Sequence, residues 1–412
     1  MQQKIIENIN NADNLENLYR TNKKNFKAAF LAIADNYDTD LVKFWKIRLS
    51  TQTSHRKFEI EDFRAIFILS IFSWLLIKIP DFFTQINKEE FFSRNLSLIL
   101  FNALILFTFW INKIFEKQKI ILYLAAISVL AVYLNLIPNW QNDSVVLAFV
   151  HSPLFLWCIF GLAFISFQFR NISKRISYIR FNGEYIIMAG LILIAGGLFT
   201  AITLELFRAI NIDISEFYSE NILTLGGVAA PMVAFYLIKI YPDLTSKITP
   251  VIARIFTPIV LITLIIYLTS FIFSSGSLIE DRNILIIFNV MLIAVLALTI
   301  FSITELDKSK QRDVNVLMLL ALAVAALIID SFALTAIINR LMLGITPNRV
   351  IVFGSNVLIF VNLIFIAKNL LLSYFKNASS ENVEAITAEF LTYYMLWTLF
   401  VIFILPFVFK FQ

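Results

Sequence analysis

The chain has 412 residues, of which 59% are hydrophobic and 15% are charged, against roughly 25% charged residues in an ordinary soluble domain. This composition excludes a soluble globular protein, and the single cysteine and two distant histidines argue against a disulfide, a zinc site or a haem site. The net charge of +5 does not indicate nucleic-acid binding, because the basic residues flank hydrophobic stretches, where membrane orientation explains them.

Residues 1–63 are polar and predict a small cytoplasmic segment of three helices. Asp13 and Glu16 have the spacing of a capping box at the first helix, and Asp38 is the predicted N-cap of the last. The last helix carries an apolar stripe, which consists of Leu41, Phe44, Trp45 and Leu49. Two interpretations stay open: the stripes pack on one another or on the membrane surface, or they bind a protein partner.

Residues 64–412 predict an all-α, polytopic bundle, because hydrophobic runs of about 20 residues recur and each can cross a bilayer core of about 30 Å. We expect eleven transmembrane helices. They lie near 64–83, 96–115, 119–137, 145–167, 185–209, 222–241, 251–273, 284–304, 315–338, 349–372 and 388–409.

The distribution of Lys and Arg predicts a cytoplasmic N-terminus and an outer C-terminus. Most of the 34 basic residues fall in the N-terminal segment and in every second connection. The opposite connections hold few of them, which are Lys88, Arg94, Arg208, Arg282, Arg340, Arg349 and Lys410.

The connection before the fifth span predicts an interfacial helix, because Ile172, Ile176 and Ile179 share one helical face. Near the outer end of the fifth span, Glu205 and Arg208 are one turn apart. We expect them to form a self-contained ion pair rather than a substrate site.

Asp330 is the most informative residue, because it interrupts the apolar run of the ninth span. A charge at such a depth costs roughly 2.5 to 3.5 kcal/mol. Ser331 and Thr335 mark an adjoining polar face, which we expect to turn toward other helices. Asp330 is either a coupling site for protons or cations, or a structural hydrogen-bonding group.

The tenth span predicts a polar seam along one side, because its polar residues repeat every seven positions. They are Asn348, Ser355, Asn362 and Asn369.

The connection before the tenth span predicts a tight hairpin on the outer face. Gly344 ends one helix in a left-handed conformation, Thr346 caps the next and Pro347 starts it. Arg340 and Arg349 flank the hairpin, where they anchor it at the interface or meet an anionic group.

The stretch from Ile337 to Val350, read as I-I-N-R-L-M-L-G-I-T-P-N-R-V, resembles the R-I-x-x-Y-G-L-T-x-N-R signature of the domain of unknown function 4153 family. The order of an acidic loop, a span containing Pro231 and a loop leading to Arg254 is also similar to that family. The resemblance covers about residues 185–372 and departs at Leu343, where the signature has Tyr. It implies a bacterial cytoplasmic-membrane protein and no established activity.

The sequence carries no catalytic motif, so we expect neither an enzyme nor a cofactor. The first hypothesis is a permease-like protein for a small solute or ion, with Asp330 at its centre. The alternative is a non-enzymatic membrane sensor or scaffold that acts through its N-terminal helices. Its expected partners are the lipid bilayer and, in the alternative, a protein; the oligomeric state stays open.

Overall fold

The computed structural model describes residues 1–412 except 51–58, 84, 274–281, 307–312 and 377–380. The described residues form helices and no strand, as the sequence predicts. The chain divides into two compact units, Met1–Phe58 and Glu59–Gln412.

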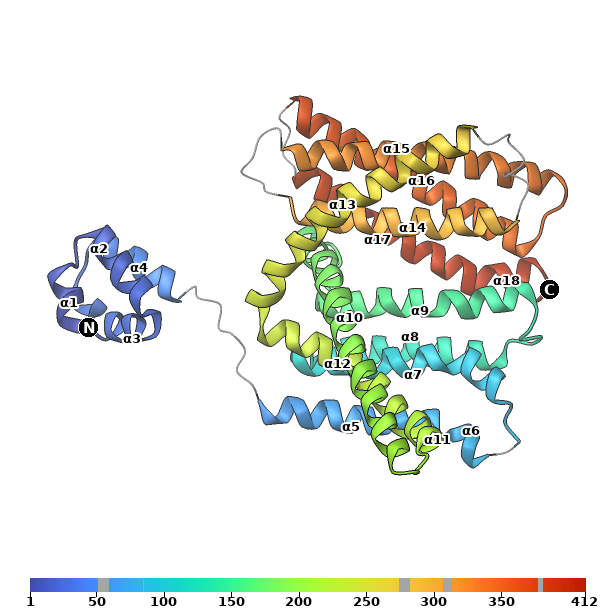
Figure 1. The fold of residues 1–412 in the computed structure, drawn as a ribbon, viewed down its shortest axis with the longest axis horizontal. Helices are drawn as coiled ribbons and strands as arrows, with labels where there is room; N and C mark the ends of the chain where they lie inside the picture. Colours follow the sequence, from blue (N-terminus) through green and yellow to red (C-terminus); the bar gives the residue numbers. More distant parts are fainter. Residues whose placement is uncertain (51–58, 84, 274–281, 307–312, 377–380) are drawn as a thin grey trace. The chain divides into compact units, whose positions relative to one another are not determined.

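The first unit is a bundle of short helices: α1 (Gln2–Glu7), α2 (Ala12–Thr21), α3 (Lys23–Ile33), a 3₁₀ turn (Ala34–Asn36) and α4 (Asp40–Ser50) (Figure 1). Its apolar side chains pack on one another around Trp45, whose exposed fraction is 1%. The Trp45 ring lies 5.1 Å from that of Phe26 and 5.4 Å from that of Tyr19.

The helix starts in this unit differ from the predicted ones. Asn11 caps α2 by accepting a hydrogen bond from the Asn14 amide at 3.1 Å, so the capping box predicted at Asp13 is wrong. At α4, the Thr39 hydroxyl accepts a hydrogen bond from the Val42 amide at 3.3 Å. Asp38, the predicted cap, instead pairs with Lys43 at 2.8 Å.

The second unit contains the apolar helices, and each predicted span overlaps one of them or consecutive ones. They are α5 (Ile60–Ile77), α6 (Ile79–Phe82), α7 (Lys88–Ile111), α8 (Lys117–Leu136), α9 (Asp143–Phe164), α10 (Ile172–Ala209), α11 (Ser215–Phe217), the π-helix η2 (Tyr218–Leu223), α12 (Thr224–Ile240), α13 (Pro242–Phe273), α14 (Arg282–Thr304), α15 (Val314–Met342), α16 (Pro347–Lys376), α17 (Glu381–Leu399), the π-helix η4 (Phe400–Ile404) and α18 (Leu405–Val408).

Nine helical segments among the described residues are long and apolar enough to cross a membrane. Two predicted spans are not among them. The first two turns of α5 carry Glu61, Asp62 and Arg64, and in α14 the fully described stretch is Asn289–Thr304, which by itself is too short to count. A multi-pass helical membrane protein therefore agrees with the structure, and the count of eleven stays a prediction.

Helix α10 differs from its prediction because it is continuous from Ile172 to Ala209. Its 38 residues span about 57 Å at 1.5 Å per residue, so the expected interfacial helix and the fifth span are one element. Figure 1 shows α10 crossing obliquely over helices such as α5, α7 and α9, which run side by side. Gly183 does not break α10; a Cβ atom there would lie 2.0 Å from the Phe301 ring of α14, so glycine permits this close crossing.

Two hydrophobic cores hold the second unit together. One gathers aromatic side chains from α7, α9, α10 and α12 around Phe160 and Phe235, whose rings lie 6.0 Å apart. The other lies among α13, α14, α15 and α16, where buried alanines of α15 such as Ala323 and Ala326 allow close helix packing.

Polar contacts tie helix ends that the sequence assigns to the same side. At one end, the Trp110 indole donates to Asp62 at 3.0 Å. At the opposite end, the Asn348 amide donates to Asp143 at 2.6 Å, which joins the start of α16 to the start of α9. Both contacts agree with the directions that the sequence predicts for these four helices.

Candidate functional site

Asp330 lies in the middle of α15, where it is completely buried. Neither of its carboxylate oxygens has a hydrogen-bond partner in the described part of the chain. Buried polar groups are nearly always hydrogen-bonded, because leaving one unpaired costs about 1–3 kcal/mol and more for a charge. Asp330 is therefore an exception that packing alone does not explain.

Two buried amides of α16 lie at nearly the same depth as Asp330. Helices α15 and α16 form an antiparallel hairpin. At a rise of 1.5 Å per residue, Asp330 lies about 18 Å along α15 from the tip of the hairpin, while Asn356 and Asn362 lie about 14 Å and about 22 Å along α16 from the same tip. The Asn356 amide donates to Asn289 of α14 at 3.0 Å. The Asn362 amide donates to Tyr394 of α17 at 2.7 Å, while its carbonyl oxygen has no hydrogen-bond partner among the described residues. These two amides of α16, bonded to α14 and α17, thus form a polar layer at the depth of Asp330.

Ser331 and Thr335 do not join Asp330. Both are exposed, and their hydroxyls donate to carbonyls of their own helix, Leu327 and Ser331, each at 2.8 Å. The prediction that this face turns toward other helices is wrong. A hydroxyl whose hydrogen bond is made within its own turn needs no partner helix and can face lipid.

The polar seam of α16 contacts other helices at three of its four positions. Besides Asn362, Ser355 accepts a hydrogen bond from Trp397 of α17 at 3.1 Å, and Asn348 reaches Asp143 of α9. Asn369 instead donates to its own helix, to the Phe365 carbonyl at 2.8 Å. The sequence does not single out Asn356, because it falls outside the seven-residue repeat.

Glu205 and Arg208 form the predicted ion pair at 2.8 Å, with both side chains more than half exposed. Solvent or headgroups screen such a pair, so it contributes little to stability.

The hairpin before α16 has the predicted turn chemistry. Gly344 has a φ of +145°, a conformation that residues with a Cβ rarely adopt. Thr346 accepts a hydrogen bond from the Arg349 amide at 3.4 Å, and the Arg349 guanidinium donates to the Gly344 carbonyl at 2.6 Å. Arg340 lies in the last turn of α15. The Arg349 guanidinium therefore closes the turn.

A partly buried charge cluster lies at the other end of the helices, and the sequence does not predict it. Arg180 of α10 lies 3.4 Å from Glu305, which follows α14, and 3.9 Å from Glu384 in the first turn of α17. Its guanidinium also donates to the Thr304 carbonyl at 2.6 Å. Burial is the main cause that raises the pKa of Glu305 to about 7; the Arg180 charge opposes this rise, and Glu184 and Glu384 add to it.

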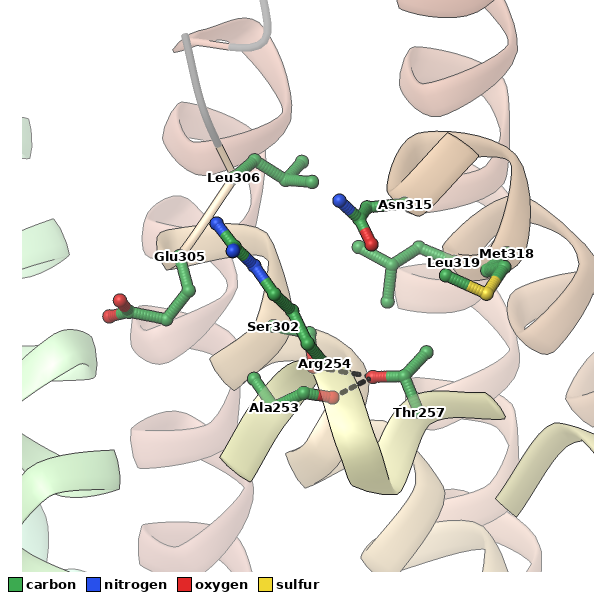
Figure 2. A pocket seen from close by; sticks show the side chains of 9 residues that line it. All are labelled: Ala253, Arg254, Thr257, Ser302, Glu305, Leu306, Asn315, Met318 and Leu319. Atoms are coloured by element: carbon green, nitrogen blue, oxygen red, sulfur yellow. Dashed lines mark hydrogen bonds between the residues drawn. The ribbon is translucent and has the colours of Figure 1, made fainter. Parts of the chain in front are cut away.

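Two cavities flank this cluster. One lies among α13, α14 and α15, has a volume of about 20 Å³ and holds roughly one water molecule. Figure 2 shows Arg254 extending along this cavity, while the Glu305 carboxylate points away from it. In its wall, the Thr257 hydroxyl lies 3.0 Å from the Ser302 hydroxyl. The other, of about 260 Å³, is lined by Arg180, Glu184 and Lys239. The Arg180–Glu305 ion pair thus joins the linings of both cavities.

Within the described part of the chain, no group of three or more His, Cys, Asp or Glu residues is arranged to hold a metal ion. Comparison of the chain with protein-family models, with curated proteins and with solved structures finds no match.

Proposed function

We propose that this protein is a permease-like carrier of a small solute or ion, with Asp330 as the group that takes up and releases a proton or binds a cation. The observation that carries the proposal is the complete burial of an acid that has no hydrogen-bond partner among the described residues. An ionised carboxylate in this position costs several kcal/mol, so burial favours the neutral acid. It can change charge only if another conformation admits water or a cation.

Irregular helices supply the hinges that such a change requires. Helix α12 contains Pro231, α13 contains Pro250 and Pro258, and the segments η2 and η4 are π-helical. Prolines kink helices, and π-helical segments recur at functional sites. The polar layer at Asn356 and Asn362 offers groups that a hydrated ion would meet next to Asp330.

The orientation and the cellular context are part of the proposal. The basic residues support a cytoplasmic N-terminus. The resemblance of the stretch from Ile337 to Val350 to the domain of unknown function 4153 family suggests a bacterial cytoplasmic membrane.

The experiment is proton uptake into proteoliposomes that contain an entrapped pH-sensitive dye, driven by a potassium diffusion potential. We expect uptake above that of protein-free liposomes, and loss of this uptake in Asp330→Asn. Ser331→Ala is the matched control, because its hydroxyl bonds only within its own helix. Equal uptake by the wild type and Asp330→Asn would contradict the proposal.

A second candidate function, a membrane scaffold, has its own observation. The first unit buries its core but leaves Phe44 53% exposed and Leu31 43% exposed. Exposed apolar side chains on a unit of this size are a means of binding a partner protein.

A further inference from the structure

An apolar groove runs between α16 and α17. Its volume is about 790 Å³, within the range of about 300–1,000 Å³ that is typical of ligand pockets. Its walls include Phe353, Val357 and Val361 of α16, and Phe390 and Leu396 of α17.

The groove has the length of one membrane leaflet. From Phe353 to Phe365, both of which line it, α16 rises about 18 Å at 1.5 Å per residue, and half of a hydrocarbon core of about 30 Å is about 15 Å. An extended acyl chain therefore fits along it.

The wall of the groove is preformed. A Cβ atom at Gly354 would lie 2.0 Å from the Trp397 ring, so the absence of a side chain lets this ring lie against α16. The Trp397 indole also donates to Ser355 at 3.1 Å, which fixes the orientation of the ring.

One end of the groove carries a carboxylate beside aromatic rings. Glu389 lines the groove, is exposed, and has no ion pair or hydrogen bond among the described residues. The Phe390 ring lies 5.8 Å from that of Phe365 and 5.3 Å from that of Tyr393. A carboxylate beside aromatic rings is the chemistry that recognises an ammonium group.

An arginine lies beside the same turn of α17. The Arg175 guanidinium donates to the Thr392 hydroxyl at 3.1 Å and to the Ala388 carbonyl at 3.4 Å, and no acid of the described residues lies within ion-pair distance of it. Arginine is well suited to phosphate. Arg175 does not itself line the groove, but it contacts the turn of α17 that carries Glu389, so two opposite charges lie beside one turn of this helix.

We propose that this groove binds one phospholipid with a zwitterionic headgroup. Its acyl chain lies along the groove, its ammonium group contacts Glu389, and its phosphate contacts Arg175. This site does not depend on the transport proposed above.

The test is native mass spectrometry of the full-length protein released from nanodiscs that contain equal amounts of chain-matched phosphatidylethanolamine and phosphatidylglycerol. We expect the wild type to retain the ethanolamine lipid about fivefold more, the ratio that about 1 kcal/mol from an ammonium contact gives. Glu389→Gln should bring the ratio close to one.

Two further variants separate the headgroup from the chain. Arg175→Gln should lower retention of both lipids equally, and Val361→Trp, which fills the groove, should lower both strongly. Ile194→Trp, on a 72% exposed position of α10, is the matched control and should retain lipid like the wild type. Three results would overturn the proposal: the wild type retains both lipids equally, Glu389→Gln leaves the ratio unchanged, or a second copy of the chain is found in place of lipid.

Discussion

The Nε atom of Arg180 lies 3.4 Å from Oε1 of Glu305, and this pair joins the oblique helix α10 to the end of α14. Glu384, with 3% of its side chain exposed, lies 3.9 Å from the Nη2 atom of the same guanidinium. One arginine thus holds three helices together at one end of the second unit.

Arg180→Gln should lower the thermal stability of the protein in detergent. The change removes the ion pair with Glu305 and the hydrogen bond that the guanidinium donates to the Thr304 carbonyl, and a hydrogen bond to a charged group contributes about 1.5–3 kcal/mol. Because Arg180 is 42% exposed, we expect a loss at or below the lower end of this range. The control is Arg170→Gln, because the guanidinium of Arg170 lies 5.7 Å from the Phe169 ring and outside the cluster. Equal unfolding midpoints for the two variants would show that the cluster does not stabilise the fold.

Stability should fall as the pH rises from about 4.5 to about 7. Glu305 has a pKa of about 7 in the folded protein against 4.5 for an ordinary glutamate, so the folded state binds more protons in this window and deprotonation destabilises it. The effect should not exceed about 3 kcal/mol, at 1.36 kcal/mol for each pH unit. Thermal unfolding of Glu305→Gln should lose this slope, while Glu116→Gln, an exposed acid, should keep it.

The eleven hydrophobic runs and the turn at Gly344 could be predicted because each depends on neighbours in the sequence. Apolar length determines a span, and Gly344, Thr346 and Pro347 each have a local reason for their place. The cluster at Arg180 could not be predicted, because it depends on how α10 crosses the bundle. The apolar face of Ile172, Ile176 and Ile179 likewise predicts a separate interfacial helix and does not reveal that this segment continues into the fifth span as α10.

Asp330 and Ser331 show the same limit within a single helix. Their positions in an apolar span are plain from the sequence, but which of the two faces the interior depends on the neighbours of α15. Serine satisfies its hydroxyl within its own turn, whereas aspartate has no such bond here.

Two substitutions in the first unit should have opposite consequences. Trp45→Ala should destabilise this unit by about 3–5 kcal/mol, the usual cost of removing a large buried ring. Phe44→Ala should change its stability little, because the side chain is 53% exposed. Limited proteolysis of the full-length protein should therefore cleave residues 1–50 faster in Trp45→Ala only. In the scaffold alternative, a photo-crosslinking residue at Phe44 should give one discrete adduct in cells, and the absence of an adduct would contradict that alternative.

Membrane orientation can be tested with single cysteines in a Cys158→Ser background. Ser215→Cys should react with an impermeant thiol reagent from outside, whereas Ser173→Cys should react only after the membrane is opened. Both positions follow from the distribution of Lys and Arg. Reversed labelling would invert every assignment of inside and outside.

The most direct test of the central claim is the reactivity of Asp330→Cys in the same background. A carrier must bring this position into contact with water in at least one conformation, although it is completely buried in the structure described here. We therefore predict that a small maleimide alkylates Asp330→Cys in intact membranes, more slowly than it alkylates Ser173→Cys. The control is Ala326→Cys, which is one turn away and equally buried and should stay unreactive over the same time. Complete protection of Asp330→Cys, in a protein that elutes and melts like the wild type, would contradict the account and reduce Asp330 to a packing residue.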